Sequence, residues 1–301
     1  MSAAVLPLDE RLLHWAELGR HWARLGAPLR PSQQDLDSYV AAIGCRSDPS
    51  TTPRALILGV TVELCHLSWP SGTHLLALDR TEAMIQGVWP GERSQAICGE
   101  WLTMPLQRQS RDVVFCDGGV TCVPYPEGTR RLIDSLDHVL VPGGICALRL
   151  YVPPSTRESA AAVLEDLLAG RIGSLNLLKL RLGMALQTDP HVGVELGTIW
   201  NKIHAAAPSL SDLALRTGWG LDHLSAITSY RDSAVRYYFP TAEQVLALFA
   251  EHAPAFTLQQ CRRPSYTLGE CCPMIILRKS SDSGSRPATP QGPSKINSQV
   301  R

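Results

Sequence analysis

The sequence has no excess of charge of either sign, because 28 Lys and Arg residues balance 28 Asp and Glu residues among its 301 residues. Proteins that bind nucleic acid neutralise phosphates with clustered Lys and Arg side chains. The balance therefore argues against a nucleic-acid partner. The content of 45% hydrophobic and 19% charged residues is typical of a globular protein that buries a sizeable core.

Long apolar runs are also lacking. No run approaches the ~18 residues of a membrane-spanning helix, and no basic stretch followed by an apolar core stands near Met1. We therefore expect neither a membrane span nor a signal peptide, and a cytoplasmic protein.

Cysteine motifs are absent although the chain has nine cysteines. There is no C-x-x-C pair and no Cys/His cluster with zinc spacing, so no metal site is expected. The thiols are best interpreted as reduced, buried small hydrophobes, which again favours the cytosol.

The middle of the chain contains short apolar runs separated by helical stretches. Runs of strand length occur at 55–60, 74–79, 94–99, 112–117 and 145–152. They are continuously apolar rather than alternating, which is typical of parallel strands covered by helices on both faces. This pattern predicts a doubly wound α/β domain.

The regions around this domain differ in composition. After Pro153 helical periodicity replaces the strands for some ninety residues, and two further strands follow near 256–260 and 273–278. The tail from Ser280 is rich in Ser, Pro and Gly, and it is expected to be disordered. The predicted organisation is N-terminal helices that pack on or cap the core (1–50), a Rossmann-like domain (51–152 and 240–279), a helical lid or substrate region (153–239) and the tail (280–301).

Polar residues and glycines stand where the predicted strands end. In such sheets ligands bind beyond the carboxyl ends of the strands. Asp79 ends the second strand twenty residues after Gly59 ends the first, and a carboxylate at this separation can accept hydrogen bonds from ribose hydroxyls. The third strand is followed by Glu100 and Trp101, and the fourth by Asp117 and Gly118.

These segments resemble those of the class I S-adenosylmethionine-dependent methyltransferases. The resemblance covers roughly 54–153, and more loosely 239–279, and rests on "LALDRTEAMI", "GEWLTMP", "RDVVFCDGG" and "LDHVLVPGGICALRL" in this order. It implies a mostly parallel, seven-stranded Rossmann-like sheet, with a helical insertion after the fifth strand. It further implies S-adenosylmethionine as the cofactor. It places the turn at Gly59 at the methionine part of the cofactor, Asp79 at the ribose, Glu100 with Trp101 beside it at adenine, and Asp117 facing the methyl group. Arg80 and Gly118 are also predicted to bind the cofactor.

The turn "LILGVTVEL" departs from the family pattern, acidic-x-Gly-x-Gly-x-Gly. Ile57 occupies the acidic position, and Thr61 and Glu63 occupy the later glycine positions. The Thr61 hydroxyl can hold a carboxylate or cap a helix, and Glu63 can pair with an ammonium group, so both are predicted to bind the methionine end of the cofactor. The turn is similar to the "LGVTPEL" of a group of uncharacterised bacterial methyltransferase-like proteins.

Each strand-end residue also has a structural interpretation. Asp79 can be the N-cap of the helix that follows, Glu100 a solvated loop acid, and Asp117 simply the end of a strand. The glycine-poor turn also leaves open that the protein binds S-adenosylmethionine or a nucleotide without catalysis, as a sensor or scaffold. An NAD-dependent oxidoreductase would use the same Asp79, but such enzymes have a full G-x-G-x-x-G motif, which this turn lacks.

The insertion is expected to contact the acceptor, because segments over the carboxyl edge of a sheet exclude water. Arg231, Tyr237 and Tyr238 are predicted to bind it, since Arg can clamp an anion and Tyr can stack or hydrogen-bond. Asp117, Tyr230 and His204 are the candidates for removing a proton. The alternative is that the tyrosines pack on the sheet and His204 is an ordinary helix residue.

The resemblance and the absence of charge together predict methyl transfer to a small-molecule acceptor by in-line displacement at an N, O, S or C nucleophile. Neither the acceptor nor the oligomeric state, monomer or homodimer, follows from the sequence.

Overall fold

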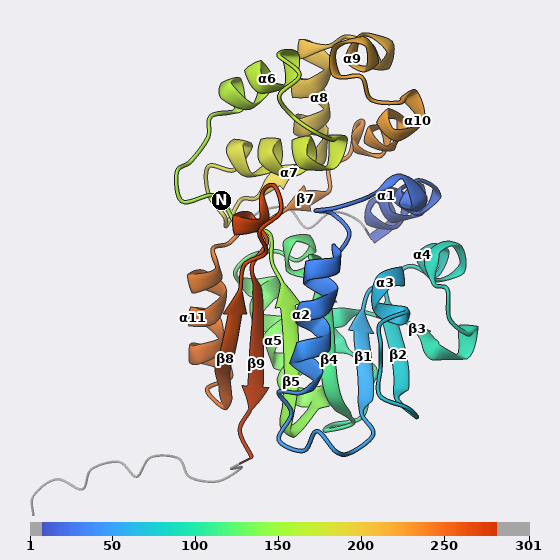
Figure 1. Cartoon of the computed structure of the whole chain (residues 1–301), viewed down its shortest axis with the longest axis vertical. Coiled ribbons are helices and arrows are strands. Elements are labelled where there is room, and N and C mark those ends of the chain that lie inside the picture. Colours follow the sequence, from blue (N-terminus) through green and yellow to red (C-terminus); the bar gives the residue numbers. More distant parts are fainter. Residues whose placement is uncertain (1–7, 282–301) are drawn as a thin grey trace, which may run out of the picture.

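The computed structural model describes residues 8–281, and side chains from residue 13 onward. The predicted disordered tail therefore lies outside the described residues, apart from Ser280 and Ser281. Figure 1 shows a helix-covered sheet with a cap of helices beyond one of its edges.

A seven-stranded sheet in the order β3-β2-β1-β4-β5-β9-β8 forms the centre of the molecule. Strands β1 to β5 pair in parallel, whereas β9 is antiparallel to both β5 and β8. The strands are β1 (Arg54–Leu58), β2 (His74–Asp79), β3 (Ala96–Cys98), β4 (Arg111–Asp117), β5 (Leu140–Arg149), β8 (Phe256–Arg262) and β9 (Met274–Lys279).

The continuous apolar runs arise because the parallel strands are buried on both faces. In β1, Leu56 and Leu58 pack in one core cluster with residues of α5 and α11, whereas Ala55 and Ile57 pack in another with residues of α2 and α4. The helices and 3-10 turns of this part are α2 (Gln33–Ile43), α3 (Val62–Cys65), α4 (Glu82–Val88), η2 (Arg93–Gln95), η3 (Trp101–Thr103), η4 (Gly119–Cys122), α5 (Glu127–Val139), α11 (Ala242–His252) and η6 (Gly269–Cys271).

The segment between β5 and α11 is mainly helical and lies beyond the sheet edge where β1 ends (Figure 1). It also holds a two-stranded antiparallel ribbon, β6 with β7, which the sequence pattern did not predict because each strand has only two residues. Its elements are α6 (Ala160–Leu168), α7 (Leu175–Leu186), β6 (Val194–Glu195), α8 (Leu196–Ala206), α9 (Leu210–Thr217), α10 (Leu221–Leu224), η5 (Ser225–Tyr230) and β7 (Arg236–Tyr237).

The N-terminal segment joins this cap. The helix α1 (Leu8–Arg20) ends five residues before Leu25, where the apolar stripe ends, and a 3-10 turn, η1 (Trp22–Arg24), continues it. Leu18 and Leu25 pack in the same core cluster as α7, α8 and η5. The predicted fold class is confirmed: a doubly wound, mostly parallel seven-stranded sheet with N-terminal helices and a helical insertion after the fifth strand.

Candidate active site

A large pocket lies at the carboxyl ends of the parallel strands, under the N-terminal segment and the insertion. It has about 1190 Å³ of empty space, counting the part that opens to solvent, which suits a cofactor and a small ligand together. One side consists of strand-end residues, and the opposite side is mostly aromatic and aliphatic. The predicted residues that line it are Gly59, Thr61, Asp79, Arg80, Glu100, Trp101, Asp117, Gly118, Tyr230 and Tyr237.

Gly59 makes the turn at the end of β1. Its φ of +92° lies in the region that side chains disfavour, and its amide donates to the Leu78 carbonyl over 2.8 Å. A Cβ at this position would lie 3.6 Å from the Trp101 indole and 4.0 Å from the Asp79 carboxylate. The single glycine of the turn therefore stands where the backbone most needs one, between two predicted ligands of the cofactor.

Asp79 is 8% exposed at the end of β2. Its Oδ1 accepts a hydrogen bond from the Thr81 amide over 2.8 Å, and Thr81, not Asp79, is the N-cap residue of α4. The other oxygen, Oδ2, is the one that faces Gly59. Burial raises the pKa of Asp79 to about 6 against the opposing effects of Thr81 and Arg80, so a further donor from a ligand would stabilise its charged form.

Trp101 and Glu100 follow β3 at the rim of the pocket. The Trp101 indole donates to the Leu78 carbonyl over 2.7 Å, which fixes the ring against Gly59 and Gly119. A Cβ at Gly119 would come within 2.9 Å of that ring. Glu100 is exposed, and its carboxylate makes no hydrogen bond with the described residues, so that group is open to a ligand and to solvent alike.

Asp117 ends β4, and both of its carboxylate oxygens are occupied. They accept from the Arg149 guanidinium over 2.5 and 2.8 Å, and the Tyr39 hydroxyl donates to Oδ1 over 3.1 Å. Asp117 lies beside the pocket, but its carboxylate neutralises a buried cation. Protein donors therefore take three of the roughly four hydrogen bonds that this carboxylate can accept, and its role as a proton acceptor stays a prediction.

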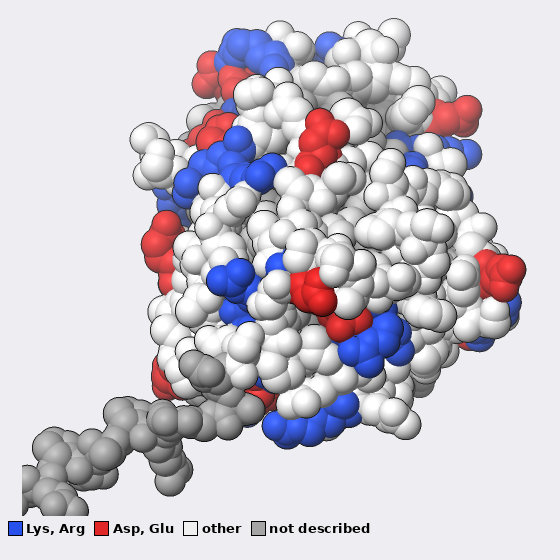
Figure 2. Space-filling model, turned by 60° about the horizontal axis from the view of Figure 1, so that its bottom comes forward, with Lys and Arg blue, Asp and Glu red and all other residues white. Residues whose placement is uncertain are grey.

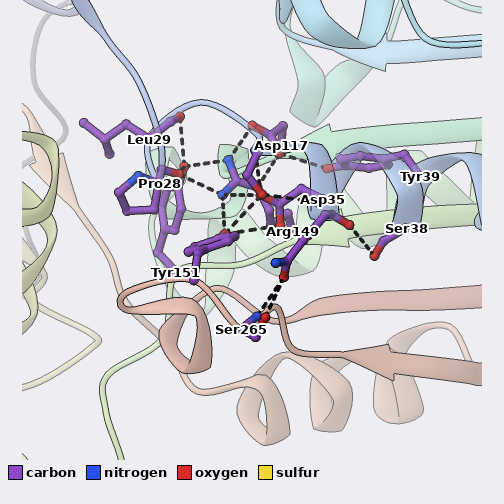
Figure 3. A network of polar contacts seen from close by, with 12 residues as sticks. Pro28, Leu29, Asp35, Ser38, Tyr39, Asp117, Arg149, Tyr151 and Ser265 are labelled. Carbon is purple, nitrogen blue, oxygen red and sulfur yellow. Dashed lines mark hydrogen bonds and ion pairs between the residues drawn. The ribbon is translucent and has the colours of Figure 1, made fainter.

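Arg149, which the sequence analysis did not single out, connects the sheet with the N-terminal segment (Figure 3). Its side chain is fully buried, and Nη1 donates to the Pro28 carbonyl over 2.7 Å. Tyr151 donates to the carbonyls of Pro28 and Leu29 over 3.1 Å. The signal was present, because an arginine inside an otherwise apolar strand needs a buried partner.

The covering side of the pocket holds a second polar residue that was not predicted, Lys179 of α7. It is 2% exposed, donates to the Ala226 carbonyl over 3.2 Å and lies 4.7 Å from the centre of the Tyr230 ring. Burial lowers the pKa of Lys179 to about 7. Tyr230 and Tyr237 meet edge to face with 6.3 Å between ring centres, and Trp15 and Trp22 of the N-terminal segment complete this wall.

Two predicted methionine-end ligands lie differently. Thr61 lines the pocket and is 6% exposed. Glu63 is not among the lining residues: its Oε1 accepts from the Arg30 guanidinium over 2.6 Å, and its Oε2 is buried without a partner among the described residues. Arg30 also lies over the Trp22 ring, 5.8 Å from its centre. Glu63 thus binds Arg30 of the N-terminal segment.

Three further predicted residues are not brought to this pocket. His204 stacks on Trp200 with 5.6 Å between ring centres, and the Arg231 guanidinium lies over the same indole at 4.8 Å. These residues line a separate hollow between α8, α9 and η5. Tyr238 is buried, and its amide donates to the Thr121 carbonyl over 2.9 Å. None of His204, Arg231 and Tyr238 is among the residues that line the large pocket.

Within residues 8–281 no group of three His, Cys, Asp or Glu side chains is placed to hold a metal ion. No helix among them is long and apolar enough to cross a membrane.

Comparisons with known proteins find the fold but no near relative. No family model matches the chain, and no curated protein matches it. Among solved structures, a Rhodobacter sphaeroides protein described as "Putative Zn-dependent Alcohol Dehydrogenases" superposes with a TM-score of 0.61 at 14% identity, covering 91% of this chain and 100% of that one. At this identity the likeness shows the fold alone.

Two weaker likenesses are with methyltransferases. The 1,6-didemethyltoxoflavin-N1-methyltransferase of Burkholderia thailandensis, solved with S-adenosylhomocysteine, has a TM-score of 0.48 at 13% identity, and 93% of each chain is covered. An S-adenosylmethionine-dependent methyltransferase of Mesorhizobium loti has a TM-score of 0.44 at 14% identity, with 81% of this chain and 100% of that one covered. Scores this low carry no argument about function.

The strand order, the parallel direction of β1 to β5 and the pocket at their carboxyl ends agree with the fold that the motifs implied. The chain therefore has the Rossmann-like fold of the class I S-adenosylmethionine-dependent methyltransferases.

Proposed function

We propose that this protein transfers the methyl group of S-adenosylmethionine to a small, largely apolar molecule. The observation that carries the proposal is a single pocket in which strand-end polar residues face an aromatic wall. The strand-end side suits a nucleoside cofactor, and the aromatic side suits an unsaturated acceptor.

The strand-end residues fit the cofactor. The Oδ2 of Asp79, which faces Gly59, can accept from ribose hydroxyls, and these donors would stabilise the charge of a carboxyl whose pKa burial raises to about 6. The Trp101 indole, fixed by its bond to Leu78, offers a flat face for adenine beside Glu100. Gly59 and Thr61 remain for the methionine end. When bound, S-adenosylmethionine supplies an electrophilic methyl group on a sulfonium sulfur.

The protein's own task is to orient the acceptor and exclude water. Holding two reactants in line can contribute about 7–11 kcal/mol to a reaction barrier. The covering wall provides this through Trp15 and Trp22 from the N-terminal segment and Tyr230 and Tyr237 from the insertion. Burial raises the pKa of Tyr230 above its usual value, so its hydroxyl stays protonated at neutral pH and acts as a hydrogen-bond donor rather than a base.

A small acceptor is also supported by the surface charge. Figure 2 shows Lys and Arg interspersed with Asp and Glu on the face it presents, without a broad region of one sign. A polyanion that needs a continuous basic surface has no such surface on that face.

The experiment is calorimetry with S-adenosylmethionine, S-adenosylhomocysteine and NAD. Both sulfur nucleosides should bind, and Asp79→Asn should weaken them ten- to a hundredfold, because hydrogen bonds to a charged group contribute about 1.5–3 kcal/mol. Asp134→Asn, an exposed acid on α5, is the matched control and should bind like the wild type.

Four results contradict parts of the proposal. If neither sulfur nucleoside binds at millimolar concentration, the function is not methyl transfer. NAD binding in their place would indicate an oxidoreductase. Equal binding by the wild type and Asp79→Asn would show that the ribose site lies elsewhere. Tight binding of S-adenosylmethionine without turnover on any panel of aromatic acceptors would favour the non-catalytic sensor.

A further inference from the structure

Lys179 is a buried cation with no anionic partner. The residue is 2% exposed, and no carboxylate among the described residues forms an ion pair with its Nζ. An ammonium has three donors, and the described contacts are the Ala226 carbonyl at 3.2 Å and the face of the Tyr230 ring. Burying an ammonium group without an anionic partner costs folding free energy. At a position with a purely structural role, Leu or Met would give a more stable fold.

The surroundings of Lys179 offer further unused donors. Trp15 and Trp22, which line the same wall, have buried indole N–H groups without an acceptor among the described residues. His14 donates from Nδ1 to the Ser229 carbonyl over 3.0 Å, so its only proton at neutral pH is already used, and it does not line the pocket. The unused donors are therefore those of Lys179 and the two indoles. The wall is therefore rich in donors, and its rings are apolar and flat.

We propose that Lys179 is the anion-binding residue of the acceptor side of this pocket, and that the acceptor is a planar aromatic molecule with a carboxylate. This inference rests on the proposed function, because it assigns the half of the pocket that the cofactor does not use. A carboxylate has two oxygens and can accept from the ammonium and from an indole N–H together. The rings of Tyr230 and Tyr237 provide the contacts for the aromatic body.

The ionisation of Lys179 should make anion binding at this site depend on pH. Burial lowers its pKa to about 7, so the free protein loses this charge as the pH rises through 7, and a bound anion must bring a proton with it above that pH. The groups packed against it do not titrate there, and Asp79, which lines the strand-end side of the same pocket, titrates about one pH unit lower. Burial lowers the pKa of His14 to about 4, and it raises the pKa of Tyr230, Tyr237 and Cys122 well above neutrality. Arg80 is the other cationic residue near His14.

The test uses 2-naphthoate and its neutral isostere 2-naphthamide as probes, measured by calorimetry at pH 6.5 and pH 9, with and without saturating S-adenosylhomocysteine. The wild type should bind 2-naphthoate at least tenfold more tightly than 2-naphthamide at pH 6.5. At pH 9 this preference should fall about tenfold or more, whereas 2-naphthamide should bind equally at both pH values.

Two variants complete the test. Lys179→Met should lose the preference for 2-naphthoate at pH 6.5 and retain affinity for 2-naphthamide. Lys202→Met, which removes an exposed lysine of α8, should behave like the wild type. The proposal is overturned if the wild type shows no preference for the anion, if the preference persists in Lys179→Met, or if it does not change with pH. Since S-adenosylhomocysteine binding is measured in the same series, failure of the cofactor site and failure of the Lys179 site are distinguishable.

Discussion

Replacing Lys179 with Met should stabilise the ligand-free protein, by an amount that depends on pH. Lysine in an unfolded chain has a pKa of 10.5, and burial lowers the pKa of Lys179 to about 7. Each factor of ten in a proton equilibrium is worth about 1.36 kcal/mol, so the difference between 10.5 and 7 amounts to about 5 kcal/mol. This is the cost of burying the charged form.

The sign follows from which state binds the proton. Well below pH 7 the lysine is charged in both states, and the fold bears the full cost. Between pH 7 and 10.5 the unfolded chain still binds a proton that the folded protein has released, so the cost decreases by about 1.4 kcal/mol per pH unit. It is about 4 kcal/mol at pH 7, about 2 kcal/mol at pH 9, and absent above 10.5.

The assay is urea unfolding of the wild type and Lys179→Met at several pH values between 6.5 and 9.5. The variant's advantage should shrink by about 2 kcal/mol from pH 7 to pH 9, on top of a constant offset for the lost bond to Ala226 and the altered packing. Cysteines and other groups that titrate in this range contribute equally to both proteins and cancel. A constant difference across the range would refute the interpretation of Lys179 as a buried lysine without an anionic partner.

Three further changes test the strand-end side. Burial raises the pKa of Asp79 from 3.8 to about 6, so the charged carboxylate destabilises the fold by about 3 kcal/mol above pH 6. Asp79→Asn should therefore raise the free energy of unfolding by about 3 kcal/mol at pH 8 and by little at pH 4. Arg149→Met should destabilise by about 3–5 kcal/mol, since it leaves Asp117 charged and buried, and adding Asp117→Asn should recover much of the loss in thermal unfolding. Glu63→Gln should change S-adenosylhomocysteine affinity less than threefold in calorimetry, because its partner is Arg30; a loss as large as that of Asp79→Asn would show that Glu63 reaches the cofactor.

The strand-end side of the pocket was predictable because it depends on local rules. Parallel strands end at a common edge, so residues that follow separate apolar runs meet there without further information. This placed Gly59, Asp79, Trp101 and Asp117 around one pocket. The rule does not predict which residues pair with each of these side chains. Asp117 is held by Arg149, which lies 32 residues away in the chain, and no pattern in the sequence links the two.

The covering side was not predictable in the same way. In the run "LLKLRLG" of α7, Lys179 and Arg181 have similar surroundings in sequence, yet only Lys179 faces the pocket. Arg181 pairs with Glu158 and Asp166 at the surface of the insertion. Helical periodicity places the two residues on different faces. Which face is buried depends on how η5 and the N-terminal segment dock, and that is set by contacts between residues far apart in the chain.

The glycine-poor turn can now be explained by conformation and by partners. Thr61 has a φ of −65° and stands directly before α3, which contains Glu63, so neither position needs the left-handed backbone that only glycine adopts freely. The position that does need it, at φ +92°, is Gly59. A side chain at position 63 therefore causes no strain, and Glu63 uses it to bind Arg30. Since Arg30 belongs to the segment that carries Trp22 to the pocket, the departure from the family pattern contributes to closing the aromatic side of the pocket.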